Sequence, residues 1–299
     1  MARVLILVLT VMLVLSTKRA YSGGTDPIAL RVLRDLQAQN ELTETVQASL
    51  VQIHSQVING QIVPTLRITA DYAYAKPRRL RISLLKIESY APPDFIERLD
   101  VSDEAKPRVM LFTEKGTITY DPATGEVLER LPDLPADMLY YFNRTTGLMA
   151  ALPFHDITVV GRFVQDGREH VALRIVPHAN AGSKALTSRD LTLTIDDVRH
   201  VIVKAEELIT DTNEEGKQFD DLPRVAVSQF VAIEGIPALS HHEEIWDERV
   251  TYGSHPEVPP SQAVSHSFVP YLHQVEDSYD NLILNAAVSP TIFLAPSHP

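Results

Sequence analysis

The stretch between residues 62 and 84 alternates hydrophobic and polar side chains over an unusual length. From Leu66 to Tyr74 every second residue is apolar or aromatic, and mostly polar residues stand between them. Because successive side chains of a strand face opposite sides, this pattern predicts a long strand with one buried face. Residues 75–78, Ala-Lys-Pro-Arg, interrupt the alternation, and proline cannot donate to a β-ladder. We therefore predict a hairpin whose second strand begins at Arg79.

The same two-residue period recurs along most of the chain, separated by turn-forming residues such as Asn-Gly and Asp-Gly. It predicts further strands over residues 46–58, 109–113, 117–120, 127–131, 157–164, 171–175, 191–195, 201–209, 225–233 and 238–250. Short strands at this spacing are typical of an antiparallel sheet. We predict an α+β protein, mainly β, with about ten or eleven strands in one strongly curved antiparallel sheet.

Two segments show helical spacing instead. Asp26 and Pro27 are typical of a helix start, with an acidic N-cap and proline in the first helical position. One apolar stripe follows, formed by Ile28, Ala29, Val32, Leu33 and Leu36. A second helix is predicted over residues 135–152, which carry a broad apolar face. We expect the first helix, around residues 27–39, to lie on the sheet.

The two ends of the chain differ from its middle. Residues 1–22 combine Arg3, an apolar run and small residues at the end, which predicts a signal peptide. The run is shorter than the roughly 20 residues that span a bilayer, so we expect cleavage, with an uncleaved peptide as the alternative. One domain is then predicted over 23–252, interrupted by an insertion at 91–107. The Pro-rich segment 253–299 keeps large apolar residues and either packs back on the sheet or extends as a tail.

Charge and cysteine content narrow the functional classes. The 299 residues carry a formal net charge of -12, and loss of the three positive charges in the signal peptide makes it -15. Nucleic acids and anionic membranes attract basic patches, so neither is an expected partner. The chain has no cysteine, which excludes disulfides, thiolate metal sites and a lipid-modified N-terminal cysteine. We expect a periplasmic or otherwise secreted protein without a lipid anchor.

One cluster of metal-ligand residue types stands out, from His241 to Glu244. On a strand, each face would offer one histidine and one glutamate, whereas zinc takes three or four protein ligands. A metal site would need His54 or His155 as a partner. The chain has no HExxH or GxSxG motif and no glycine-rich phosphate loop. We therefore favour a solvated strand here and expect no cofactor, with a metal-dependent hydrolase as the alternative.

Short motifs and the order of elements resemble the outer-membrane lipoprotein carrier family, the LolA/LolB-like superfamily, which includes periplasmic lipid-binding sensor domains. The resemblance covers roughly residues 26–252. The matching pieces are Tyr74 to Arg81 around the Lys-Pro turn, Glu114 to Gly116, Tyr120 to Pro122, Pro135 to Leu139, Leu193 to Asp196, and Asp211 to Gly216. The resemblance implies an unclosed β-barrel whose helices cover the concave face and whose apolar cavity takes acyl chains.

The resemblance also implies roles for individual residues. The alternating apolar residues would line the cavity, namely Leu66, Ile68, Ala70, Tyr72, Tyr74, Leu80, Ile82, Leu84, Val171, Leu173, Ile175, Leu191, Leu193 and Ile195. Ordinary core packing is the other role for these residues. Family members hold the lid through an arginine before the turn proline, and Lys76 stands there in this chain. Lysine lacks the planar fork of arginine, so its contact would be a single point donor.

Two functions follow from this resemblance. The first is a non-enzymatic carrier or binder of lipid or lipoprotein acyl chains, with a membrane protein as donor or acceptor. The second is a sensor or adaptor that uses the same fold and cavity.

Overall fold

The computed structural model describes residues 26–58, 61–76, 79–90, 107–113, 116–131, 152–178, 190–209, 222–249 and 270–295. The predicted signal peptide, nearly all of the insertion at 91–107, and the predicted helix over 135–152 up to residue 151 lie outside these residues. Within the described part, no helix is both long enough and apolar enough to cross a membrane.

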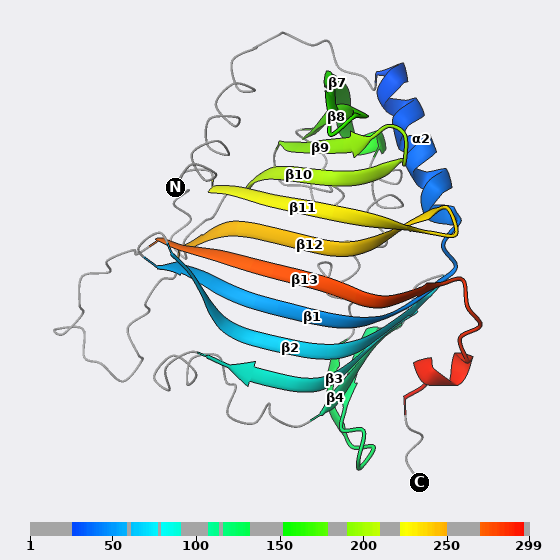
Figure 1. The fold of residues 1–299 in the computed structure, drawn as a ribbon, viewed down its shortest axis with the longest axis vertical. Helices are drawn as coiled ribbons and strands as arrows, with labels where there is room; N and C mark the ends of the chain where they lie inside the picture. Colours follow the sequence, from blue (N-terminus) through cyan, green and yellow to red (C-terminus); the bar gives the residue numbers. More distant parts are fainter. Residues whose placement is uncertain are drawn as a thin grey trace, which may run out of the picture.

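The described chain forms one antiparallel sheet with a single α-helix (Figure 1). The elements are α2 (Pro27–Glu41), β1 (Thr45–Ile58), β2 (Gln61–Ala75), β3 (Arg79–Ser89), β4 (Arg108–Thr113), β5 (Gly116–Tyr120), β6 (Val127–Leu131), η2 (Leu152–Phe154), β7 (His155–Gln165), β8 (Arg168–Pro177), β9 (Leu191–Asp196), β10 (Val201–Ile209), β11 (Leu222–Ile233), β12 (Ile236–Arg249), β13 (Pro270–Leu284) and η5 (Pro290–Phe293). The thirteen strands are ordered β6-β5-β4-β3-β2-β1-β13-β12-β11-β10-β9-β8-β7.

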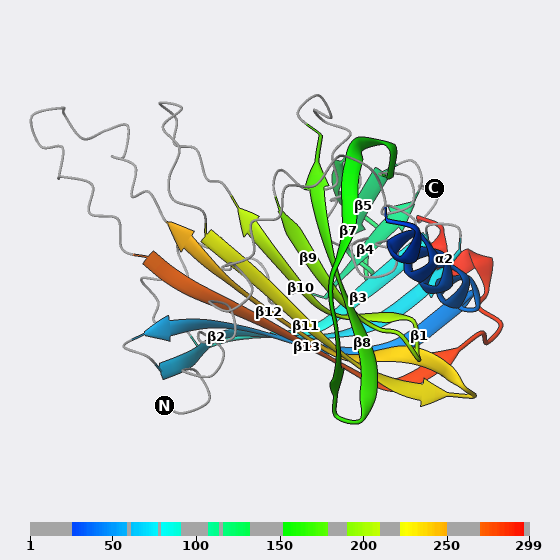
Figure 2. The same cartoon turned by 90° about the horizontal axis from the view of Figure 1, so that it is seen from above.

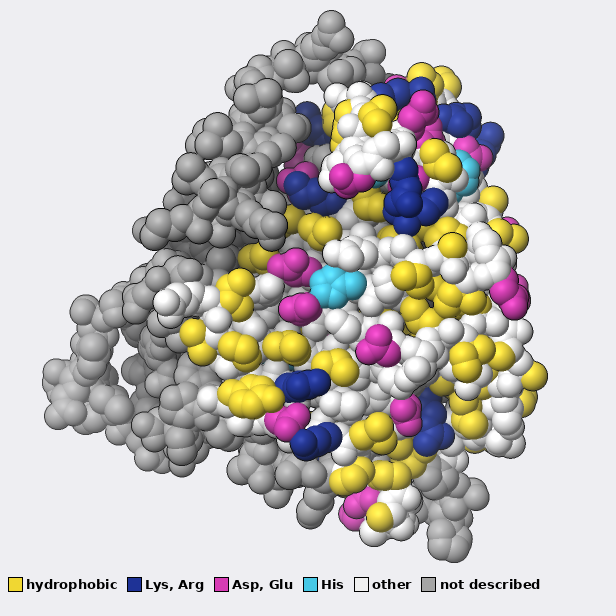
Figure 3. All heavy atoms as spheres, in the orientation of Figure 1, with side chains coloured by type: hydrophobic (Ala, Val, Ile, Leu, Met, Phe, Trp, Pro, Cys, Tyr) yellow, Lys and Arg dark blue, Asp and Glu magenta, His cyan; other side chains and the backbone are white. Residues whose placement is uncertain are grey.

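The sheet is strongly curved and does not close. Its end strands in the described part are β6 and β7, and the strand order does not pair them with each other. Seen from above, β4, β5 and α2 lie on the same side of β13 and β1, which is the concave side (Figure 2). The outer face mixes hydrophobic and charged side chains along the same strands (Figure 3). The prediction of a mainly β, unclosed, curved antiparallel sheet is confirmed.

Strand β13 occupies the centre of the sheet, between β1 and β12. Val275 lies opposite both His54 of β1 and Glu244 of β12. The sheet therefore continues past residue 252, and residues 270–284 of the Pro-rich segment are part of it. This strand is hard to predict from the sequence because two of its inward positions are the polar residues His273 and Asp277. Its residues therefore do not alternate between apolar and polar.

Helix α2 packs on the half of the concave face formed by β7 to β11. Its N-cap is Asp26, whose side chain accepts a hydrogen bond of 2.7 Å from the backbone N–H of Ile28, as the sequence predicts. The buried stripe of the helix joins strand residues in one core: Ala29, Val32, Leu33, Leu36, Ile157, Val171, Leu173, Ile175, Leu191, Leu193, Ile195, Ala205 and Ala226. Ile28 is 44% exposed, so its predicted place in the stripe is wrong; it lies at the solvent side of the first turn.

The other half of the concave face carries a second core on β1 to β4 and β13. Its buried members are Val46, Ala48, Leu50, Ala70, Tyr72, Tyr74, Leu80, Ile82, Phe112 and Tyr279.

The C-terminal segment covers the opposite face near β3: Arg81 donates a hydrogen bond of 3.0 Å to the carbonyl of Ile292, and the guanidinium of Arg79 lies 5.4 Å from the Phe293 ring centre. The described part of the Pro-rich segment therefore adds one strand to the sheet and packs its last turn, η5, against β3.

Candidate ligand-binding cavity

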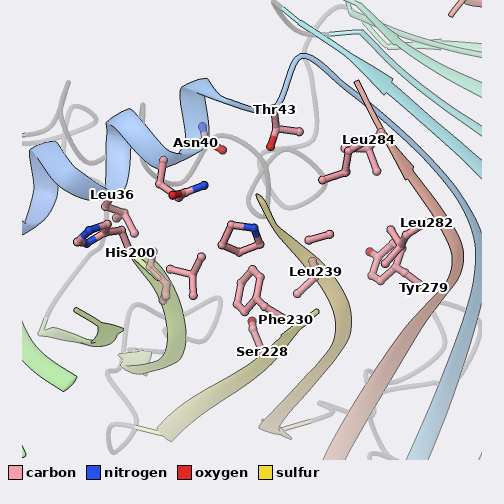
Figure 4. A pocket seen from close by; sticks show the side chains of 16 residues that line it. Leu36, Asn40, Thr43, His200, Ser228, Phe230, Leu239, Tyr279, Leu282 and Leu284 are labelled. Carbon is pink, nitrogen blue, oxygen red and sulfur yellow. The ribbon is translucent and has the colours of Figure 1, made fainter. Parts of the chain in front are cut away.

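A cavity of about 110 Å³ lies on the concave side, between the C-terminal half of α2 and strands β10 to β13 (Figure 4). The described residues that line it are Leu36, Gln39, Asn40, Thr43, Val46, His200, Val201, Ile202, Ser228, Phe230, Pro237, Ala238, Leu239, Tyr279, Leu282 and Leu284. It sits between the two cores, because Leu36 belongs to the first and Val46 and Tyr279 to the second.

The floor of the cavity is apolar because the inward positions of the strands carry large hydrophobic residues. Phe230 of β11 lies opposite Leu239 of β12. Leu284 of β13 lies opposite Val46 of β1. Directly opposite residues of antiparallel strands share a face, so these four side chains form a continuous apolar surface. Tyr279 continues it, with its ring edge-on to Tyr72 at 5.7 Å between centroids.

The wall formed by α2 is polar. Gln39 and Asn40 continue the helix's apolar stripe after Leu36, and Thr43 follows just beyond the C-cap residue Leu42. Two of the lining residues each carry a fully buried atom that has no hydrogen-bond partner in the described part, Nε2 of Gln39 and Nδ1 of His200. His200 adopts the left-handed backbone conformation, with φ 52°, in the turn after β9, and its N–H donates to the Asp196 carbonyl at 2.8 Å. No Lys, Arg, Asp or Glu is among the described lining residues.

A polar band adjoins the cavity on the concave face of β11, β12, β13 and β1. Ser228, which lines the cavity, hydrogen-bonds Nδ1 of His242 at 3.0 Å. The side-chain amide of Gln52 donates a 2.8 Å bond to Asp277. Arg224 forms an ion pair with Glu244. The inner surface therefore changes from apolar to polar along the length of these strands.

Burial shifts the protonation of two groups in this band. Desolvation raises the pKa of Asp277 to about 6, and the nearby Glu244 charge adds to the rise; the Gln52 hydrogen bond and His241 oppose it. Desolvation lowers the pKa of His54, and His273 lowers it further. The band thus holds a carboxyl group that is easily protonated and a histidine that favours its neutral form.

The cluster from His241 to Glu244 divides between the two faces of β12. His242 is 1% exposed and Glu244 is 8% exposed, so the prediction of a solvated strand is wrong for these two, because they face the concave side. Nε2 of His241 lies 3.8 Å from a carboxylate oxygen of Glu276. In the described residues no group of three or more His, Cys, Asp or Glu is arranged to hold a metal ion. The hydrolase alternative therefore gains no ligand set there.

The strand residues expected to line a cavity are placed on the concave face, but none is among the residues that line this one. Val171, Leu173, Ile175, Leu191, Leu193 and Ile195 pack under α2 in the first core. Ala70, Tyr72, Tyr74, Leu80 and Ile82 belong to the second core, with Leu84 packed against it. Leu66 and Ile68 are half-buried further along β2. Their contact with a ligand stays a prediction.

Sequence reasoning missed the polar wall of the cavity, although a signal for it exists. The helical spacing that selects Val32, Leu33 and Leu36 continues to Gln39, Asn40 and Thr43. When the spacing continues but the side chains become polar, the helix face still contacts the rest of the protein. It no longer packs against a dry hydrophobic core.

Lys76 connects the turn after β2 with the end of α2. Its Nζ donates a hydrogen bond of 2.8 Å to the carbonyl of Glu41, the last residue of the helix, and lies 3.4 Å from the Glu44 carboxylate. A cation is favourable at a helix C-terminus, where the carbonyls are unpaired. The geometry suits the predicted latch, and its role in ligand entry stays a prediction.

No family model and no curated protein matches the chain. It is similar to the solved structure of a DUF1329 family protein from Desulfovibrio piger, with a TM-score of 0.49 and 11% identity, over 90% of this chain and 98% of that one. It is also similar to a LolA superfamily protein from Nitrosomonas europaea, with a TM-score of 0.46 and 8% identity, over 88% and 96%. At identities and scores this low, neither likeness indicates what this chain binds.

Proposed function

We propose that the protein is an exported, non-enzymatic binder of acyl chains, which enter the cavity between α2 and strands β10 to β13. The observation that carries the proposal is a cavity with an apolar floor set between two solid cores. Export rests on the signal-peptide pattern of residues 1–22.

The physical basis of binding is burial of apolar surface. Removing apolar area from water contributes roughly 25 cal/mol per Å². A dry cavity of roughly 150 Å³ lined by Leu, Ile and Phe takes a benzene molecule, so a cavity of about 110 Å³ accommodates a short segment of one chain. Movement of α2 would enlarge this space, and Lys76 holds the end of the helix that covers it. No covalent step is required.

The test uses two neighbouring leucine-sized residues on opposite faces of β13. Leu282 lines the cavity, whereas Ile283 is 51% exposed. Leu282→Trp fills the cavity and is expected to lower affinity for a fluorescent fatty acid at least tenfold. Ile283→Trp adds the same side chain to the outer face and is expected to leave affinity unchanged.

Native mass spectrometry of gently purified protein provides a second measurement, with bound lipid expected on the wild type and less on Leu282→Trp. A wild-type protein that carries no lipid and does not bind the fluorescent fatty acid contradicts the proposal. So does unchanged binding by both variants, because it would show that the site is elsewhere.

A further inference from the structure

We propose that Asn285 is a positioning residue of the cavity, which joins the helical wall of the cavity to its strand floor and fixes the distance between them. Asn285 directly follows Leu284, the floor residue at the end of β13. Its side chain bonds the backbone on both sides of Thr43, which belongs to the wall. The inference rests on the proposed function and adds a residue that controls how fast ligands enter and leave.

The side-chain amide of Asn285 brackets Thr43. Its Nδ2 donates a hydrogen bond of 2.8 Å to the carbonyl of Leu42, the C-cap residue of α2. Its Oδ1 accepts a hydrogen bond of 2.7 Å from the backbone N–H of Glu44. One amide thus pairs a carbonyl at the helix end and a donor in the loop that follows. The end of β13 therefore holds the connection between α2 and β1.

The backbone around Asn285 reinforces this link. Its N–H donates a hydrogen bond of 2.9 Å to the Thr45 carbonyl, and the Thr45 hydroxyl donates one of 2.8 Å to the carbonyl of Ala286. Asn285 has a φ of 52°, in the left-handed region that asparagine and glycine adopt most readily. Asparagine combines this backbone conformation with a side chain that both donates and accepts. We call its hydrogen bonds to residues 42, 44 and 45 the Asn285 clamp.

The Asn285 clamp acts where the helix has no solid core beneath it. Leu33 packs in the first core, whereas from Leu36 onward the helix covers the cavity. Thr43 and Leu284 lie at the same end of the cavity (Figure 4), so the clamp keeps wall and floor together there. Because Asn285 is exposed, each of its bonds contributes little to global stability. The clamp can therefore open locally, without unfolding of the domain.

The experiment compares Asn285→Gly with Asn281→Gly as the matched control. Both asparagines lie at the end of the same strand and have a φ of 52° or 53°, so glycine keeps the backbone and removes only the side chain. The amide of Asn281 lies 3.4 Å from the Ser49 hydroxyl instead of bonding the helix end. Hydrogen exchange at the Glu44 amide, measured by NMR, is expected to accelerate about tenfold in Asn285→Gly alone. Exchange at residues 30–34 is expected to stay unchanged in both variants.

Ligand release is the second readout. Stopped-flow release of a bound fluorescent fatty acid is expected to become about fivefold faster in Asn285→Gly and to stay unchanged in Asn281→Gly. Asn285→Asp keeps the Oδ1 acceptor for Glu44 and loses the donor to Leu42. This variant is expected to retain slow exchange at Glu44 and an intermediate release rate, and it keeps the proposal testable if the glycine variant misfolds.

Equal effects of the two glycine variants overturn the proposal, because they would show a general loosening of β13. Unchanged exchange at Glu44 in Asn285→Gly also overturns it. If the wild type binds the fatty acid and the Asn285 variants release it at the wild-type rate, Asn285 does not control the cavity and the proposed function stands. If the wild type binds no fatty acid, the proposed function fails, and exchange at Glu44 alone decides whether Asn285 holds the wall.

Discussion

The two ends of helix α2 meet the same concave surface with opposite results. The N-terminal half, with Val32 and Leu33 fully buried, closes a solid core on β7 to β9. The C-terminal half, from Leu36 onward, covers a cavity over β10 to β13. The spacing of the inward positions is continuous along the helix, so the helical geometry does not explain the change.

The difference lies in the side chains on both sides of the interface. Under the N-terminal half, β-branched and leucine side chains from three strands interdigitate with the helix, as is usual for a close-packed interior. Further along, the helix presents Gln39 and Asn40, and Thr43 follows just after its end; these polar side chains fill the space less well. A cavity thus arises where a packing stripe keeps its position and loses its hydrophobic volume.

The largest expected effect comes from a cavity-forming substitution in the core under the N-terminal half of α2. Leu33 is 0% exposed, and Leu33→Ala is expected to lower the free energy of unfolding by about 3 to 4 kcal/mol, the usual loss for a buried leucine. Leu282→Ala, beside the existing cavity and half-buried, is expected to lose only about 1 to 2 kcal/mol. Urea denaturation of both variants measures the contrast, and equal losses would show that the two ends are packed alike.

The next effect comes from the polar band beside the cavity. In the folded protein the pKa of Asp277 is raised from its ordinary value of 3.8 to about 6. Between pH 3.8 and 6 the folded state therefore holds a proton that the unfolded state has lost. This stabilising contribution is complete below pH 3.8 and disappears as the pH rises through 6. The loss is at most about 3 kcal/mol.

The measurement is the difference in unfolding free energy between Asp277→Asn and the wild type at pH 4, 5, 6 and 7.5. The variant is expected to gain stability relative to the wild type as the pH rises, and most of the gain falls between pH 4 and 6.5, because asparagine cannot ionise. A difference that does not change with pH would mean that Asp277 titrates normally.

The sequence predicts the fold well where apolar and polar residues alternate along a strand. Strands β2, β3, β8 and β9 alternate in this way, and so the two-residue period locates them, although β3 and β8 extend beyond their alternating residues. Strand β13 fails this test because its inward residues include His273 and Asp277, which sit in the polar band rather than in a dry core. A strand whose buried face is itself polar gives no hydrophobic signal.

The site was harder to predict than the fold for a related reason. Alternation identifies which residues face inward, as for Leu173 and Leu193, but it does not say whether the helix above fills the space against them. Both became core because the apolar stripe of α2 reaches them. The cavity depends on the match between helix and sheet volumes at Gln39 and Phe230, and this match is a property of the packed structure, not of either segment alone.

The smallest expected effect concerns the attachment of the cavity end of the helix. Lys76→Met keeps most of the aliphatic stem and removes the ammonium that bonds the Glu41 carbonyl. The side chain of Lys76 is partly exposed, at 26%, so the expected loss of global stability is only about 1 kcal/mol. Hydrogen exchange is expected to accelerate at residues 37–41 and to stay unchanged at residues 30–34, because the solid core still holds the first half of the helix.

Lys86→Met is the matched control. Lys86 is exposed and pairs with Glu88 of its own strand, so its removal is expected to leave exchange in α2 unchanged. If Lys76 acts as a latch, Lys76→Met also speeds both uptake and release of a fluorescent fatty acid, since opening of the helix end limits both rates, and changes its equilibrium affinity little. Uniform acceleration of hydrogen exchange along the whole of α2 would instead mean that the two ends of the helix move as one unit. The two ends would then differ in packing but not in motion.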